Sequence, residues 1–109
     1  MVKNWLHKTP RSKPIYMVGV FNHPTSVRTL GWFGSEQEAN LAVKNNESDI
    51  HENYYEYVVV EKFYSGLYPF CFTEGSMWYK WDSKKKKYLR KSKAPQIIEK
   101  LKVINLTLG

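Results

Sequence analysis

A continuous apolar segment at residues 15–21 constrains the fold more than any other part of the chain. Its sequence, IYMVGVF, has the length and the β-branched and aromatic content of a strand, and it carries no charged residue. A strand without a polar face has to be covered on both of its faces, so it belongs in the interior of a sheet. We therefore predict that residues 15–21 form a central strand with a neighbour on each side.

The next segments predict one of those neighbours and a helix. The turn-forming sequence NHPTS at 22–26 separates the first strand from a second at 28–33, which pairs back on it as a hairpin. Ser35 followed three residues later by Glu38 has the pattern of a capping box, so a helix begins there and runs to about residue 44. An apolar stripe at helical spacing would face the sheet: Ala39, Ala42 and Val43.

Three further strands of the sheet are predicted between residues 54 and 91. Residues 54–63 alternate and are rich in tyrosine and valine, which is typical of a strand with two distinct faces. Residues 77–81 and 87–91 predict a hairpin, with the turn between them at 82–85. The alternating faces of that hairpin would carry very different side chains, because aromatic and basic residues follow one another there.

These elements predict a small α+β domain with a mostly antiparallel sheet and one main helix. A helix that joins two strands of one sheet usually makes a right-handed crossover, which places the first strand between the second and third. The core is strand–strand–helix–strand, and the aromatic-basic hairpin extends one edge. Residues 1–14 form a basic amino-terminal arm, and residues 15–109 form the single domain, with a short helix at 95–101 and a last strand at 103–108.

Composition restricts the kinds of binding partner and the cellular compartment that we expect. The chain has 109 residues, a net charge of +7 and a pI near 9.5, which favours an anionic partner such as nucleic acid, a nucleotide or an acidic protein surface. The single cysteine excludes an internal disulfide framework and fits a reducing cytoplasm. No apolar run approaches the roughly 20 residues of a membrane span, and the first residues lack the apolar region of a secretory signal. We predict a cytoplasmic protein with no membrane association.

The positive charge is concentrated where large aromatic residues gather. The sequence WYKW at 78–81 leads into a lysine-rich turn. Eight of the seventeen basic residues lie between positions 80 and 93: Lys80, Lys84, Lys85, Lys86, Lys87, Arg90, Lys91 and Lys93. Aromatic faces beside a cation cluster suit a flat anionic ligand. A solvated hairpin with its tryptophans in the core is the alternative, and both interpretations remain open.

We predict a ligand-binding site that combines this hairpin with the second strand. Aromatic rings for base stacking and cations for phosphate binding make up the candidate set: Arg28, Trp32, Trp78, Lys80, Lys84, Lys85 and Arg90. Arg28 has a structural alternative, a cross-strand ion pair with Glu56 or Glu61.

Strand alternation separates the residues of 78–81 into two pairs. Trp78 and Lys80 point one way, and Tyr79 and Trp81 point the other. An unpaired lysine is costly to bury, so we predict that Trp78 and Lys80 face outward, while Tyr79 and Trp81 are mostly buried.

The sequence contains no group of residues with the spacing of a catalytic site or a metal site. The histidines are scattered, and a cluster at 49–52 containing His51 has no further spaced ligand. Cys71 lies between two phenylalanines, which is typical of a buried small hydrophobic residue. The glycines form no phosphate-binding loop. We predict a protein that is not an enzyme, with no metal site and no cofactor.

Several short motifs between residues 15 and 109 form a recognisable set: Arg28-Thr29-x-Gly31-Trp32, Glu38-Ala39, Val43, Asn45, Asp49-x-x-Glu52, Tyr57-x-Val59-x-Glu61, Gly66-Leu67-Tyr68-Pro69, Trp78-Tyr79-Lys80-Trp81 and Pro95. Taken together, they resemble a family of small uncharacterised proteins of bacteriophages and prophage-like regions. The lysine run at 84–87 looks heavier than the family pattern.

Small accessory phage proteins often counter host immunity, so the resemblance implies such a role. The first hypothesis is a non-enzymatic anti-defence protein that sequesters a nucleotide immune signal, either a cyclic oligonucleotide or an ADP-ribose-type messenger, in the cytoplasm of the host. A protein of this kind would be a homo-oligomer with its pockets near the subunit contacts. A nucleic-acid-binding module and an inhibitor of a host defence protein are the alternatives.

Overall fold

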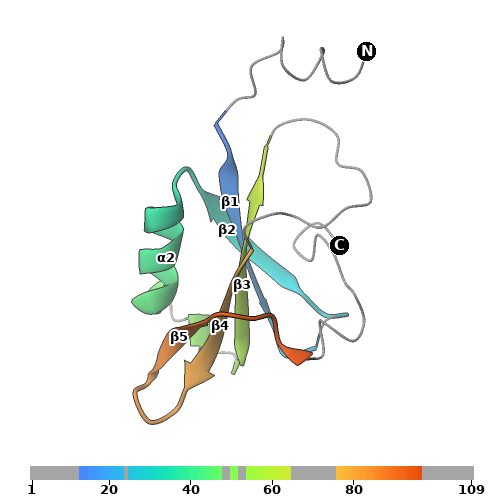
Figure 1. Ribbon diagram of the computed structural model, residues 1–109. Helices are drawn as coiled ribbons and strands as arrows, with labels where there is room; N and C mark the ends of the chain where they lie inside the picture. Colours follow the sequence, from blue (N-terminus) through green and yellow to red (C-terminus); the bar gives the residue numbers. More distant parts are fainter. Residues whose placement is uncertain (1–12, 24, 48–49, 52–53, 65–75, 97–109) are drawn as a thin grey trace.

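The computed structural model describes residues 13–23, 25–47, 50–51, 54–64 and 76–96, and it contains a five-stranded antiparallel sheet with a helix against one face (Figure 1). Along the chain the elements are β1 (Ile15–Phe21), β2 (Arg28–Phe33), α2 (Glu36–Lys44), β3 (Tyr57–Phe63), β4 (Met77–Asp82) and β5 (Lys87–Lys91). Across the sheet the strands follow the order β2-β1-β3-β4-β5. The predicted α+β fold class is confirmed.

The apolar strand β1 lies between β2 and β3, as its composition predicts. Val20 pairs with Arg28 of β2 on one side and with Val58 of β3 on the other, and both pairings are antiparallel. β2 and β3 are therefore parallel to each other with β1 between them, and α2 makes the crossover. Val20 and Phe21 are both fully buried although they lie on opposite faces of the sheet, which explains why β1 has no polar face.

The helix begins where the capping residues predict. The Ser35 side chain accepts a hydrogen bond from the Glu38 backbone N–H at 3.1 Å, and its hydroxyl donates to the Glu38 carboxylate. The apolar stripe of α2 is buried: Ala39, Ala42 and Val43. The main core lies between α2 and the sheet, where Val43 packs with Val18, Val58 and Tyr79.

A second, smaller cluster lies on the sheet face opposite α2. Phe21 and Val59 are buried at its centre, and Tyr57 and Trp78 pack against them half-buried. The Phe21 and Tyr57 rings are stacked at 5.3 Å, and the Trp78 ring meets Phe21 edge-on at 6.4 Å. This cluster holds the side chains of Tyr57 and Trp78 on the sheet face away from α2.

The strand predicted at 54–63 begins three residues late, at Tyr57. Tyr54 has a positive φ of 60°, and its backbone N–H donates to the His51 carbonyl at 2.8 Å, so the chain turns there instead of extending. The predicted arm at 1–14 and the elements at 95–101 and 103–108 lie almost wholly outside the described residues. Within the described part of the chain, no helix is long and apolar enough to span a membrane.

Candidate functional site

The two faces of β4 carry different side chains, as predicted for 78–81. Tyr79 is 1% exposed, and its hydroxyl donates a hydrogen bond to the Asn40 side chain of α2. Lys80 is exposed on the opposite face, together with the half-buried Trp78. The predicted division into two faces is confirmed, with Tyr79 buried and Lys80 exposed, but Trp78 is half-buried because it packs against Phe21 and Val59. Trp81 faces the helix side but is only half-buried, because it packs at the margin of the core against His51.

A pocket of about 550 Å³ lies beside Trp78 and Lys80, on the sheet side away from α2. Residues of β3, of the hairpin and of the segment that follows β5 line it: Tyr57, Trp78, Tyr79, Lys80, Lys91, Ser92, Lys93, Pro95 and Gln96. The strand register explains how they meet, because Tyr57 pairs with Lys80 across β3 and β4, and Trp78 pairs with Lys91 across β4 and β5. Directly paired residues share one face of a sheet.

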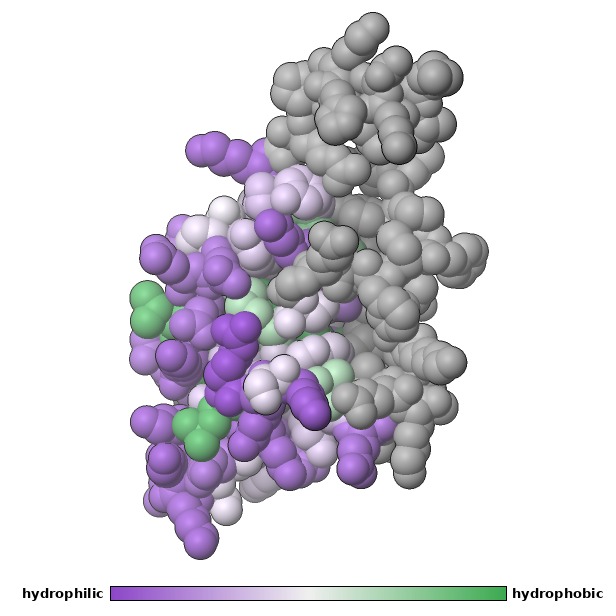
Figure 2. Space-filling model, in the orientation of Figure 1, coloured by the Kyte–Doolittle hydropathy of each residue, from purple (hydrophilic) through white to green (hydrophobic). Residues whose placement is uncertain are grey.

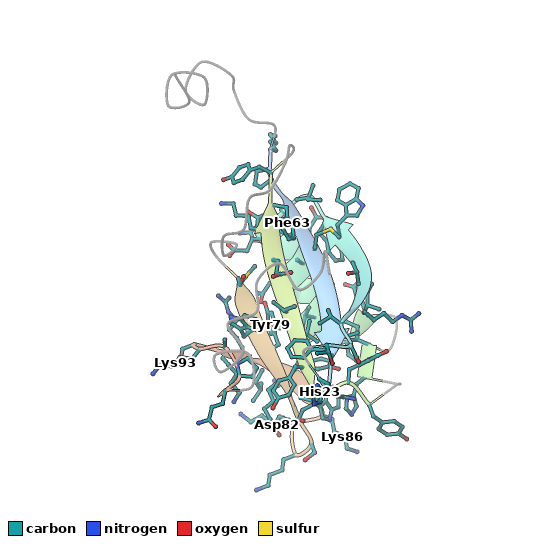
Figure 3. The ribbon with its side chains drawn as sticks, turned by 90° about the vertical axis from the view of Figure 1, so that its right-hand side faces the viewer. His23, Phe63, Tyr79, Asp82, Lys86 and Lys93 are labelled. Carbon is teal, nitrogen blue, oxygen red and sulfur yellow. The ribbon has the colours of Figure 1, made fainter. Side chains whose placement is uncertain are left out.

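Three lysines supply the charge of this pocket. Lys80 is the best defined: its Nζ lies 3.5 Å from Glu56 Oε1 and 5.9 Å from the centroid of the Tyr57 ring. Lys91 and Lys93 are exposed, and Figure 3 shows Lys93 projecting from the margin of the sheet. The arrangement therefore combines aromatic walls with mobile ammonium groups, which suits a ligand that has both a ring and a phosphate.

The seven predicted site residues do not form one site. Trp78 and Lys80 line the pocket. Arg90 is on the same hairpin but on the other face, where it is paired with Tyr79 and its guanidinium carbon lies 5.9 Å from that ring. Lys84 and Lys85 are exposed in the turn that joins β4 and β5, and they are not among the lining residues.

Arg28 and Trp32 lie on β2, at the other side of the sheet from the hairpin. β1 and β3 separate β2 from β4, which corresponds to roughly 14 Å between the two strands. Trp32 is 61% exposed there. The predicted cross-strand pair of Arg28 is also wrong: Arg28 is opposite Val20 of β1, and β2 does not adjoin β3. Glu56 pairs with Lys80 instead.

Sequence reasoning missed much of the pocket lining. Tyr57 and Lys91 reach the pocket only through their cross-strand partners, and those pairings depend on the order of the strands. Lys93 belongs to the basic cluster noted in the sequence, but no local pattern marks the other residues that follow β5: Ser92, Pro95 and Gln96. The hairpin register could have identified Lys91 from the sequence. A turn centred on residues 83–86 places Lys91 opposite Trp78.

Comparison with known proteins identifies no relative. No family model, curated protein or solved structure matches the chain. The described residues also contain no group of three histidine, cysteine or acidic side chains arranged to hold a metal ion. Asp49 and Glu52, which flank His51 in the sequence, lie outside the described residues. The candidate site therefore rests on its own geometry.

The hairpin turn is held by Asp82. Its Oδ1 accepts hydrogen bonds from the backbone N–H groups of Lys84 and Lys85, each at 2.9 Å. The bond from Lys85, followed by that from Lys84, lowers the pKa of the Asp82 carboxyl below its ordinary value of 3.8. The turn therefore gains stability from the ionised carboxylate at neutral pH and loses it as the pH falls through that lowered pKa.

We predict that Asp82→Ala increases the hydrogen-exchange rates of the Lys84 and Lys85 amides by roughly two- to tenfold at neutral pH, because both lose their acceptor. Exchange measured by NMR checks this, with Ser83→Ala as the control in the same turn. Acidifying the unmodified protein should raise the same two rates relative to the other hairpin amides. Equal rates in the Asp82→Ala variant and the unmodified protein would contradict the assigned role.

Proposed function

We propose that the protein is a non-enzymatic binder of a small phosphate-bearing aromatic ligand, a nucleotide in the broad sense, held in the pocket beside Trp78. One observation carries this proposal: aromatic rings from two strands and three lysines line the same pocket. Its volume of about 550 Å³ falls in the range of small-molecule sites. A base packs against the aromatic wall, and the ammonium groups neutralise the phosphates.

The lining chemistry supports binding without turnover. The described lining residues include no histidine, carboxylate or cysteine, so the bases and the thiol nucleophile that most hydrolases use are missing from the residues described around Ser92. A protein that binds a nucleotide and leaves it intact lowers its free concentration. We therefore extend the proposal to the sequestering role implied by the phage resemblance, with a cyclic oligonucleotide or an ADP-ribose-type messenger as the ligand and a homo-oligomer as the functional form.

Isothermal titration calorimetry with a ligand panel tests the proposal. The panel comprises cyclic di- and trinucleotides, ADP-ribose and its cyclic isomers, and AMP, with unphosphorylated adenosine as the matched control. We expect saturable binding of at least one phosphorylated compound with a fixed stoichiometry and no binding of adenosine, and the recovered ligand should be chemically unchanged. Absence of any binding below about 100 μM by folded protein would refute the proposal.

The ion pair of Lys80 predicts a variant that binds more tightly. Glu56 competes with a ligand phosphate for Lys80, since its Oε1 lies 3.5 Å from Nζ and both side chains are about half-exposed. We expect Glu56→Gln to strengthen binding by roughly two- to fivefold, the effect of removing one unit charge a few ångströms away in a water-exposed site. The same calorimetric titration measures the change.

Glu47→Gln is the matched control, because it removes an exposed acidic charge outside the pocket lining. Its affinity should equal that of the unmodified protein. Weaker binding by Glu56→Gln would mean that the carboxylate contacts the ligand directly, and the assignment of Lys80 as a phosphate-binding residue would then be wrong.

A further inference from the structure

Three connecting segments meet at one end of the sheet, the end at which β3 begins. Because β3 lies between β1 and β4 and is antiparallel to both, the end of β1, the start of β3 and the end of β4 lie at the same end. Figure 3 shows His23, Asp82 and Lys86 there, one from the turn after β1 and two from the hairpin. We call this region the loop end.

An exposed aromatic ring stands at the loop end in a conformation that side chains seldom adopt. Tyr54 is 79% exposed, more than any other large hydrophobic residue that the structure describes as exposed. Its φ of 60° is disfavoured for a tyrosine. Backbone strain of this kind, together with a ring that gains nothing from burial, is typical of a functional position.

The ring is also held in place. The Tyr54 N–H donates to the His51 carbonyl at 2.8 Å, and the Tyr54 ring meets the His51 ring edge-on at 6.0 Å. His51 in turn stacks flat on Trp81 of β4, with the ring centroids 3.7 Å apart and an interplanar angle of 8°. The segment that bears Tyr54 is thus fixed to the hairpin by a chain of aromatic contacts.

The hairpin turn places a set of cations at the same end. Lys84, Lys85 and Lys86 are all exposed. The two hydrogen bonds to Asp82 hold the backbone at Lys84 and Lys85, and Lys86 has a positive φ of 53°. Hydrophilic side chains dominate the hairpin surface in Figure 2. The loop end therefore offers a preorganised aromatic face beside cations whose side chains are free to follow an extended anion.

We propose that the loop end is a second binding surface, for single-stranded nucleic acid, on which Tyr54 stacks a base and Lys84, Lys85 and Lys86 contact successive phosphates. Stacking on exposed rings beside a cationic track is how single strands are bound without sequence preference. None of these four residues lines the pocket, so the surface uses other side chains than the proposed nucleotide site, whose Tyr57 and Lys80 lie at the same end of the sheet.

Fluorescence anisotropy with a fluorescein-labelled 12-mer of deoxythymidine, titrated between 20 and about 200 mM NaCl, tests this surface. The ring is removed by Tyr54→Asn, because asparagine tolerates a positive φ, and it is retained by Tyr54→Phe. We expect Tyr54→Asn to weaken binding by roughly 5- to 100-fold with an unchanged salt slope, and Tyr54→Phe to bind like the unmodified protein.

Replacing the lysines is expected to change the salt dependence of binding. The triple variant Lys84→Ser, Lys85→Ser, Lys86→Ser should reduce the slope of log K against log salt by about 2, because each phosphate contact on a single strand contributes about 0.7. Lys44→Ser, at an exposed position on α2, is the charge control, and Trp32→Ala, at an exposed position on β2, is the aromatic control. Both should bind the 12-mer normally, and circular dichroism confirms that all the variants are folded.

Three results would overturn the proposal. The first is no binding of the 12-mer at 20 mM NaCl. The second is equal binding of the 12-mer by Tyr54→Asn and the unmodified protein. The surface would then bind any polyanion, including inorganic polyphosphate, by charge alone. The third is tighter binding to phosphatidylserine vesicles than to the 12-mer with the same dependence on Tyr54, which would assign the surface to a membrane.

Discussion

Replacing Tyr79 with alanine is expected to lower the free energy of unfolding by about 3–5 kcal/mol, the usual cost of truncating a large buried aromatic residue. Tyr79 is 1% exposed and packs in the core between α2 and the sheet. Burial raises the pKa of its hydroxyl, although Arg90 opposes this, so the hydroxyl stays protonated and donates to Asn40. The variant leaves both a cavity and an acceptor without its donor.

Urea unfolding followed by circular dichroism measures this change, and the next residue in the strand is the control. Lys80→Ala removes a side chain of similar length from the opposite face, where its exposed pair with Glu56 is worth about 1 kcal/mol at most. Tyr79→Phe separates the hydrogen bond from the packing and should cost roughly 0.5–1.5 kcal/mol. A loss for Lys80→Ala as large as that for Tyr79→Ala would mean that the two faces are assigned in reverse.

The fold was predictable because its strongest signals are local. β1 has no polar residue, and a strand of that composition has to be central. Ser35 and Glu38 mark the start of α2 through a hydrogen bond that spans three residues, and the buried stripe follows at helical spacing. The hairpin turn is likewise local, because Asp82 binds the amides of the two residues in the turn.

The site was predictable only where it depends on neighbours in the sequence. Trp78 and Lys80 share a face because they are two apart in one strand. Arg28 and Trp32 have the chemistry of a nucleotide site, but chemistry alone does not place them. The strand order puts them on the far side of β1 and β3 from the pocket. Tyr57 is absent from the predicted site because its place beside Lys80 is set by the pairing of β3 with β4.

The segment before β3 could not be predicted from local sequence. Its tyrosines have strong strand propensity, and alternation predicts an extended chain from residue 54. The turn at Tyr54 depends instead on a hydrogen bond to His51 and on the stacking of His51 against Trp81, about thirty positions further along the chain. Tertiary contacts therefore override local propensity at this point. The same contacts keep Trp81 at the margin of the core and only half-buried.

The largest effect on ligand binding is expected from Trp78→Ala. Trp78 is the largest aromatic wall of the pocket, and losing a stacked ring should weaken binding of the nucleotide identified by calorimetry by roughly 10- to 100-fold. Because Trp78 is only half-buried and meets Phe21 edge-on at 6.4 Å, the variant should lose only about 1–2 kcal/mol of stability and remain folded.

Trp32→Ala is the matched control, since it removes the same side chain from an exposed position on β2, across the sheet from the pocket. It should bind the nucleotide with unchanged affinity. If both variants weaken binding equally, the ligand spans the sheet and the pocket beside Trp78 is not the site. If neither does, the aromatic wall serves only the packing around Phe21. Loss of binding in Trp78→Ala alone, with the variant still folded, assigns the nucleotide to the pocket, because Trp32→Ala removes the same ring from the other side of the sheet.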